Sequence, residues 1–302
     1  MTKLISMPTS PWFIDSSFTL TRAVGITSSP FSGKQRTQEF DFVGWEGTAN
    51  LPPMNRTQAV EWQAFLLECI GTRNYFNFID PDAKDPVGTY NGGYLAGEIR
   101  IDSSNSGGAN VSSATLSFAS SGSQITSTTD IFDGLVVGDY ITIAGDNNVP
   151  NNGTHKITTK TSDSVIVVNS TLTTENSTSG CSVKQNIKGS EALSLEASGN
   201  SNTGTIKKGD FLSIYSGAAA LSPRVQLVMA TADATETSQS GSPNHYSVSI
   251  QPKLRADLAD THYVGFSSTY NQSRFRLAEN DVKWTANQVS LYGISLAFAE
   301  VI

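Results

Sequence analysis

Acidic residues gathered in one turn-rich segment are the feature of this sequence that most suggests a binding site. Asp80, Asp82 and Asp85 lie in the stretch Asp-Pro-Asp-Ala-Lys-Asp-Pro, and closely spaced carboxylates are ligands that Ca²⁺ prefers. The stretch lacks the glycine and the terminal glutamate of an EF-hand loop. We therefore predict an Asp-Pro turn here, with a calcium site as the less favoured alternative.

Catalytic chemistry has less support. The histidines, His155, His245 and His262, are widely separated and fall in different expected elements, which argues against a shared metal. No Gly-x-Ser-x-Gly sequence follows an expected strand, so a serine nucleophile is not indicated. Most acidic residues stand in turns, although only the fold can bring the paired carboxylates of a glycosidase together. We predict no cofactor, no metal and no enzymatic activity, with glycan degradation as a third choice.

Tryptophan and arginine are residue types that often dominate protein interfaces. Trp45, Trp62 and Trp284 stand within or next to regular strand and helix patterns, so we expect them in cores. Trp12, beside Pro11, is instead a candidate interface anchor.

Arginines stand out because charged residues make up only 16% of the chain. The planar, multi-donor guanidinium favours arginine over lysine in interface ion pairs. We expect several arginines to pair with acids such as Glu39, Asp41 or Glu61 across subunit boundaries, and simple solvation is the equal alternative. The arginines concerned are Arg22, Arg56, Arg73, Arg274 and Arg276.

The composition of the 302 residues bounds the class of protein. An apolar share of 38% supports packed cores, and the length suffices for more than one domain. A net charge of −7 without any run of Lys and Arg argues against nucleic-acid binding. We expect neither a signal peptide nor a membrane span, and therefore predict assembly in the cytoplasm, with Cys69 and Cys181 as free thiols.

Two strands are expected before residue 45. In residues 17–26 a period of two places Phe18, Leu20, Val24 and Ile26 on one side, which predicts a strand with one buried face. Residues 40–43 predict a second strand, which we expect to pair with the first.

A helix is expected next. Asn55, followed three residues later by Gln58, predicts a helix cap, and Gly71 predicts the end of the helix. The apolar stripe of this helix consists of Ala59, Trp62, Leu66, Cys69 and Ile70. Residues 75–79 predict the strand that follows.

From about residue 103 the composition changes to Ser, Gly, Asn and Thr, with strand signals only up to residue 183. Asn151-Asn152-Gly153 predicts a hairpin turn between strands at 140–143 and 154–157. We predict a mainly β protein with one N-terminal α-helix. Residues 1–104 and 186–302 would form an α+β host domain of split-barrel or β-sandwich type, and residues 105–185 an inserted small β-barrel or sandwich.

Short sequence motifs toward both ends of the chain, called words below, have the order and spacing seen in one family. The front words are Ser29-Pro-Phe31-Ser-Gly33, Gly44-Trp45, Leu51-Pro-Pro-Met54 with Arg56, Ala59 and Trp62, and Asp80-Pro81. The back words are Lys208-Gly-Asp210, Ile250-Gln-Pro-Lys-Leu-Arg255, Phe275-Arg276-Leu-Ala278, Trp284 and Tyr292-Gly-Ile294. In these words the chain resembles the distal tail proteins of long-tailed bacteriophages, which join the tail tube to the tail tip.

The resemblance implies a structural protein of the virion rather than an enzyme. It implies a homo-oligomer, a hexameric ring, that contacts the tail tube protein on one side and the hub or tip proteins on the other. The interface and motif candidates are Trp12, Arg22, Phe31, Trp45, Arg56, Trp62, Arg274 and Arg276.

The block at 105–185 departs from many members of that family. It leaves a second reading, in which the chain is a receptor- or carbohydrate-binding tail protein whose inserted module contacts a host surface glycan. A glycan binder should present exposed aromatic side chains, whereas the aromatic residues of this block, Phe118, Phe132 and Tyr140, are expected to be mostly buried.

Overall fold

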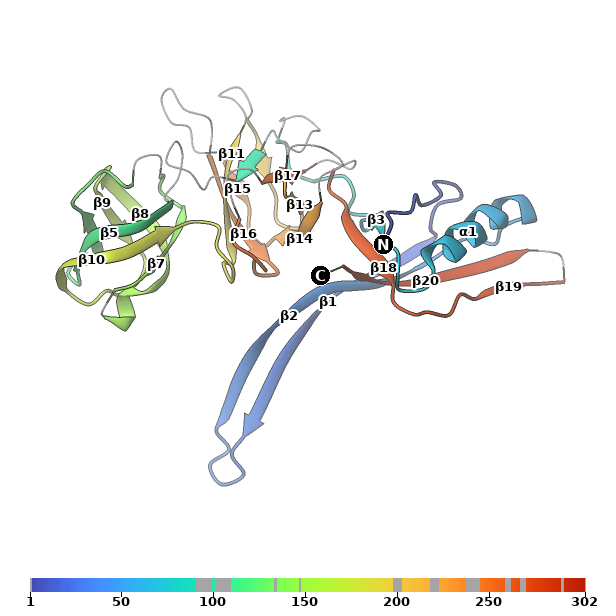
Figure 1. Ribbon diagram of the computed structural model, residues 1–302, viewed down its shortest axis with the longest axis horizontal. Helices are drawn as coiled ribbons and strands as arrows, with labels where there is room; N and C mark the ends of the chain where they lie inside the picture. The colour runs from blue at the N-terminus through green and yellow to red at the C-terminus, as the bar shows by residue number, and fades with distance from the viewer. Residues whose placement is uncertain are drawn as a thin grey trace. The chain divides into compact units, whose positions relative to one another are not determined.

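The computed structural model describes residues 2–90, 99–101, 110–132, 135–146, 148–197, 203–217, 223–236, 245–258, 262–266, 270–288 and 291–301. The chain forms two compact units, each visible in Figure 1. The first, which we call the sheet unit, combines Met1–Asp85 with Asn271–Ile302, and the second, the barrel unit, is Pro86–Tyr270. The predicted class, mainly β with one N-terminal helix and an inserted β-barrel, is confirmed in the described residues.

The sheet unit is built on antiparallel strands from both ends of the chain. The strand order is β1 (Asp15–Ser28), β2 (Gln35–Asn50), β20 (Tyr292–Glu300), β18 (Ser273–Leu277) and β3 (Phe76–Phe78), and β19 (Trp284–Ala286) pairs with β20. The predicted pairing of the first two strands is confirmed. Because β20 lies between β2 and β18, strands near the end of the chain complete the sheet that β1, β2 and β3 begin.

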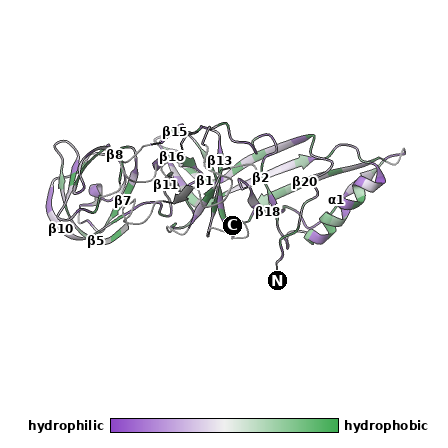
Figure 2. Cartoon of the chain, turned by 90° about the horizontal axis from the view of Figure 1, so that it is seen from above, coloured by the Kyte–Doolittle hydropathy of each residue, from purple (hydrophilic) through white to green (hydrophobic). Residues whose placement is uncertain are grey.

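Helix α1 (Arg56–Cys69) begins as the sequence predicts. The Asn55 side chain accepts a hydrogen bond from the Gln58 backbone N–H at 3.0 Å, and the Gln58 side-chain oxygen accepts one from the Asn55 backbone N–H at 3.3 Å. Both bonds satisfy backbone donors at the helix start. Apolar and polar residues alternate along the helix in Figure 2, and the buried ones are Ala59, Trp62, Phe65, Leu66 and Cys69. The prediction that Ile70 belongs to the apolar stripe of the helix is wrong. Ile70 takes a left-handed backbone conformation at the helix end, with φ of 50°, so its side chain leaves the stripe and is exposed.

Aromatic rings form the core between α1 and the sheet. Phe13 packs edge-on against Trp62 and Phe78, with ring centroids 5.4 Å apart in both pairs. Phe78 in turn packs against Phe298 of β20 at 4.6 Å, and Phe275 of β18 lies 5.3 Å from Phe298. The core thus joins rings that are more than 200 residues apart in sequence.

The inserted module is a closed barrel that lies within the predicted range of 105–185. Its strands follow the order β10 (Glu175–Lys184), β5 (Asn110–Ala119), β6 (Gln124–Ser127), β9 (Val165–Val168), β8 (Gly153–Ser162) and β7 (Tyr140–Ala144). The predicted pairing of β7 with β8 is confirmed, but the turn differs from the predicted one. Its connection contains a 3-10 helix at Val149–Asn151, and Gly153 already belongs to β8. Buried apolar side chains fill the interior, among them Phe118 and Phe132 as expected, whereas Tyr140 is only half-buried.

The barrel unit contains a second closed barrel, whose strands precede and follow the first barrel in the sequence. This barrel is the reason why the observed boundaries differ from the predicted ones. Its order is β11 (Ala192–Ala197), β16 (His245–Gln251), β14 (Arg224–Ala230), β13 (Phe211–Tyr215), β17 (Tyr263–Gly265) and β4 (Ile99–Ile101). A two-stranded sheet joins β12 (Thr205–Ile206) to β15 (Ala234–Thr235). Both barrels belong to the barrel unit, whereas the prediction assigned residues 86–104 and 186–270 to one domain with the chain ends.

Candidate assembly surface on the sheet unit

The β1–β2 hairpin extends well beyond the strands that flank it in the sheet unit. The strands pair from Asp15 opposite Asn50 to Ser28 opposite Gln35, but only Glu46–Asn50 of β2 also pairs with β20. Figure 1 shows the far part of the hairpin, in blue, reaching away from the rest of the sheet. Among the described strands, the far part therefore has no neighbour in the sheet on either edge.

Large apolar side chains are exposed on this far part, which we call the hairpin arm (residues 22–43). Val24 and Ile26 are 50% and 65% exposed, Phe40 and Phe42 are 50% and 49% exposed, and Phe31 at the turn is fully exposed. The prediction that Val24 and Ile26 share a buried face with Phe18 and Leu20 is wrong. The pairing register shifts between Arg22 and Val24, and the strand has by then passed the aromatic core.

The exposed apolar residues of the hairpin arm occupy both of its faces. A methyl group built on Gly25 would lie 3.3 Å from a ring carbon of Phe40, so Phe40 covers the face on which Gly25 stands. Val24 and Ile26 flank Gly25 along the strand, and alternation places them on the opposite face. A two-stranded ribbon that is apolar on two faces needs cover on both sides to remove these side chains from water.

Helix α1 carries a second exposed apolar stripe that sequence reasoning missed. Val60 and Leu67 are 50% and 60% exposed, and Ala64 between them is also exposed. Their spacing of four and three residues places all three on one side of the helix, away from Trp62. The available signal was that the apolar positions of residues 59–67 cover more of the helix than one buried stripe needs.

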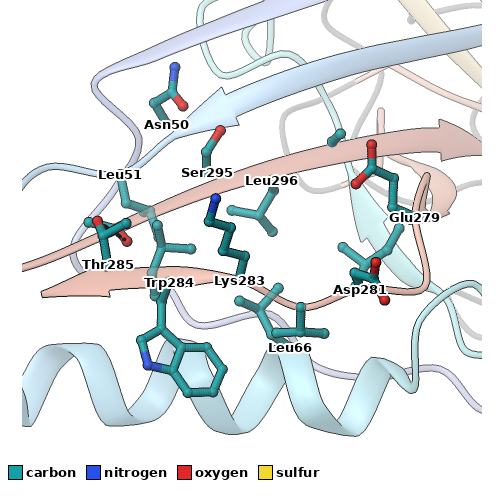
Figure 3. Close-up of a pocket in the computed structure, with 15 residues that line it drawn as sticks. Asn50, Leu51, Leu66, Glu279, Asp281, Lys283, Trp284, Thr285, Ser295 and Leu296 are labelled. Atoms are coloured by element: carbon teal, nitrogen blue, oxygen red, sulfur yellow. Dashed lines mark hydrogen bonds between the residues drawn. The ribbon is translucent and has the colours of Figure 1, made fainter.

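A pocket of about 570 Å³ opens between the β19–β20 hairpin and helix α1, as Figure 3 shows. Leu66 of α1 and Leu296 of β20 line its apolar part, while Glu279 and Asp281 lie together at one end and Lys283 extends between them and Trp284. An apolar lining with a few charged groups is suited to binding.

Trp284 is not a core residue, and the prediction that it packs in the core is wrong. Its side chain is 39% exposed, because β19 is a short edge strand whose residues are all exposed. In Figure 3 the indole extends from β19 toward α1.

The tryptophan and phenylalanine candidates lie in two kinds of place. Trp45 and Trp62 are buried, as the local patterns predicted for them. Trp12 is 40% exposed and packs edge-on against Phe13 at 5.2 Å, so it closes the aromatic core and still offers a free surface. Phe31 lies at the tip of the hairpin arm.

The arginine candidates are spread over three elements of the sheet unit. Arg22 is exposed on β1 opposite Val43, and Arg56 is exposed at the first position of α1. Arg274 and Arg276 are half-buried on β18, and the Arg274 guanidinium stacks 4.8 Å from the ring centre of Tyr75. The expected partners Glu39 and Asp41 have side chains that lie outside the described residues.

The acidic turn of residues 80–85 has the hydrogen bonds of an Asp-Pro turn. The Asp80 carboxylate accepts from the Asp82 backbone N–H at 3.2 Å and from the Ser16 hydroxyl at 3.3 Å, while Asp82 and Asp85 are exposed. The described residues contain no group of three or more His, Cys, Asp and Glu side chains placed to hold a metal ion. Cys69 and Cys181 are free thiols, as predicted, and both are buried.

Comparison with models of protein families and with curated protein sequences found no match for this chain. Among the described residues, no helix has the length and apolar character that crossing a membrane requires.

Proposed function

We propose that this chain is a structural subunit that assembles with copies of itself into a ring at the tip of a phage tail. The observation that carries the proposal is the hairpin arm, which exposes Val24, Ile26, Phe31, Phe40 and Phe42 on two faces. Contiguous exposed apolar residues of this size usually mark a surface that a protein partner covers. A neighbouring subunit on each side would cover both faces.

The arrangement favours a ring over a two-fold dimer. The hairpin arm is one patch of the sheet unit, and the exposed stripe of α1 with the adjoining pocket is another. When one patch of a subunit binds a different patch of the next, each subunit repeats the same contact, and the chain of contacts closes into a ring if the rotation permits.

We base the proposed position of the ring in the phage tail on the resemblance in the sequence words at both chain ends. Those words suggest the junction between tail tube and tail tip, a six-fold ring, the tail tube protein and the hub as partners, and the virion as location. The exposed edges of the hairpin arm supply backbone groups that such partners can pair with.

The test is the mass of the purified chain in solution, measured over a range of concentrations together with negative-stain images. Closed rings of six subunits are the expected result. The tail tube protein of the same phage should bind these rings, measured by co-sedimentation. A chain that stays monomeric at every concentration, and also in the presence of that tube protein, would refute the proposal.

A further inference from the structure

Asp146 is a buried acid whose carboxylate has no hydrogen-bond donor in the part of the chain that the structure describes. It lies in the connection after β7 of the inserted barrel and is only 7% exposed. Neither of its carboxylate oxygens accepts a hydrogen bond from a described residue. A buried carboxylate normally has several donors, because losing its water without replacement is costly. Among the described residues, the Asp146 carboxylate therefore has no hydrogen-bond donor.

A second carboxylate faces Asp146. Glu175, the first residue of β10, lies within hydrogen-bonding reach of Asp146 and is half-buried. The Asn148 side chain donates to Glu175 Oε2, and the Thr178 side chain also hydrogen-bonds the Glu175 carboxylate. Two carboxylates this close repel each other unless a proton or a cation lies between them.

Paired amide hydrogen bonds hold the backbone at Asp146. The Asn152 side chain accepts from the Asp146 backbone N–H at 3.0 Å and donates to the Asp146 carbonyl at 2.8 Å. Asn151 makes the same kind of pair with the backbone of Thr173, at 2.8 and 3.0 Å. These contacts hold the backbone at Asp146 and at Thr173 before any ligand binds, and a backbone that is already ordered loses less entropy on binding.

The loop also lies close against β10, which brings the two acids together. At Gly145 the backbone has φ of +90°, and a methyl group built there would lie 2.9 Å from the Gly180 carbonyl oxygen. The pairing of β10 with β5 is irregular between Glu175 and Thr178, so β10 bends where it carries the site. A glycine at position 145 thus permits the approach that a larger residue would block.

We propose that Asp146 and Glu175 bind a Ca²⁺ ion on the inserted barrel, with the side-chain oxygens of Asn148 and Thr178 as further ligands. Calcium accepts carboxylate, amide and hydroxyl oxygens in irregular arrangements and fills its remaining positions with water. The half-exposed side of Glu175 leaves a path for the ion and its water.

The sulfur atom nearby does not favour a softer metal. Cys181 donates its thiol hydrogen to the Thr178 carbonyl at 3.7 Å and is buried. A protonated thiol is a poor metal ligand, and zinc sites use thiolates. The donor set is therefore one of oxygen atoms.

Calorimetric titration of the full chain, previously treated with EDTA, with CaCl₂ tests the proposal. We expect saturable binding, a rise in the melting temperature on adding Ca²⁺, and loss of both effects in Asp146→Asn. Glu175→Gln should weaken binding at least tenfold. The matched control is Asp130→Asn, an exposed acid of the same barrel, which should bind Ca²⁺ like the unchanged chain.

Two results would overturn the proposal. One is the absence of saturable Ca²⁺ binding by the unchanged chain. The other is equal binding by the unchanged chain and by Asp146→Asn, once circular dichroism has shown that the variant is folded.

Discussion

Replacing both aromatic residues of the hairpin arm, Phe40 and Phe42, by serine should weaken self-association strongly without unfolding the sheet unit. Each ring is about half exposed in the single chain. An aromatic side chain offers roughly 200 Å² of surface, so about 100 Å² of each ring remains for a neighbouring subunit to cover. At about 25 cal/mol per Å², the two rings together contribute at most about 5 kcal/mol per contact.

That free energy corresponds to a loss of association on the order of a thousandfold, because about 1.4 kcal/mol changes an equilibrium constant tenfold. Mass measurements against concentration give the midpoint of assembly for the unchanged chain and the double variant. The matched control is Val137→Ser, which removes a comparably exposed apolar residue from the barrel unit and should leave the midpoint unchanged.

The melting temperature separates assembly from folding. Phe40 and Phe42 lie outside the aromatic core of the sheet unit, so the melting temperature of the monomeric double variant should stay close to that of the monomeric unchanged chain. If the double variant assembles at the same midpoint as the unchanged chain, the hairpin arm is not the contact surface and the reasoning from its exposure is refuted.

Three further predictions concern the fold. Asn55→Ala removes the cap of α1 and should lower the free energy of unfolding by about 1 kcal/mol, measured by denaturant titration, while Asn55→Asp should preserve most of it. Burial raises the pKa of Asp139 from 3.8 to about 6. Between these two pH values the folded state holds a proton that the unfolded state has released. The free energy of unfolding should therefore fall by up to about 3 kcal/mol as the pH rises from about 4 to about 6. Asp139→Asn should remove this slope, and an unchanged slope in the variant would assign it to other groups. Burial raises the pKa of Cys69 to about 12, and Cys181 is also buried. Neither thiol should react with a thiol reagent at neutral pH until denaturant is added. Rapid labelling of the native chain would contradict the buried positions.

Local features of the sequence predicted local structure well. The capping box of Asn55 and Gln58 and the hairpin between β7 and β8 are decided within a few residues. The sequence contains a Gly-Asp pair at the start of two strands, Gly138-Asp139 before β7 and Gly209-Asp210 before β13, and both pairs adopt the same local structure. Each glycine has a positive φ, and each aspartate accepts from the backbone N–H three residues earlier.

Exposure was harder to predict than secondary structure. Val24 and Ile26 continue the period of two that begins at Phe18, but only the first part of the strand lies over the core. The side chain of Trp284 is as apolar as that of Trp62, yet it stands on an edge strand. A periodic pattern identifies a strand or helix, whereas burial depends on which other elements cover it.

The sequence by itself determined that the protein is mainly β, that one capped helix follows the first two strands, and that a small β module interrupts the chain, because propensity, turn chemistry and periodicity are properties of neighbouring residues. Only the tertiary structure showed that the hairpin arm extends beyond the strands beside it and that Asp146 lies close to Glu175. The first depends on where β20 ends its pairing with β2, and the second on how the segment after β7 packs against β10. A local sequence pattern does not determine such contacts between separate segments.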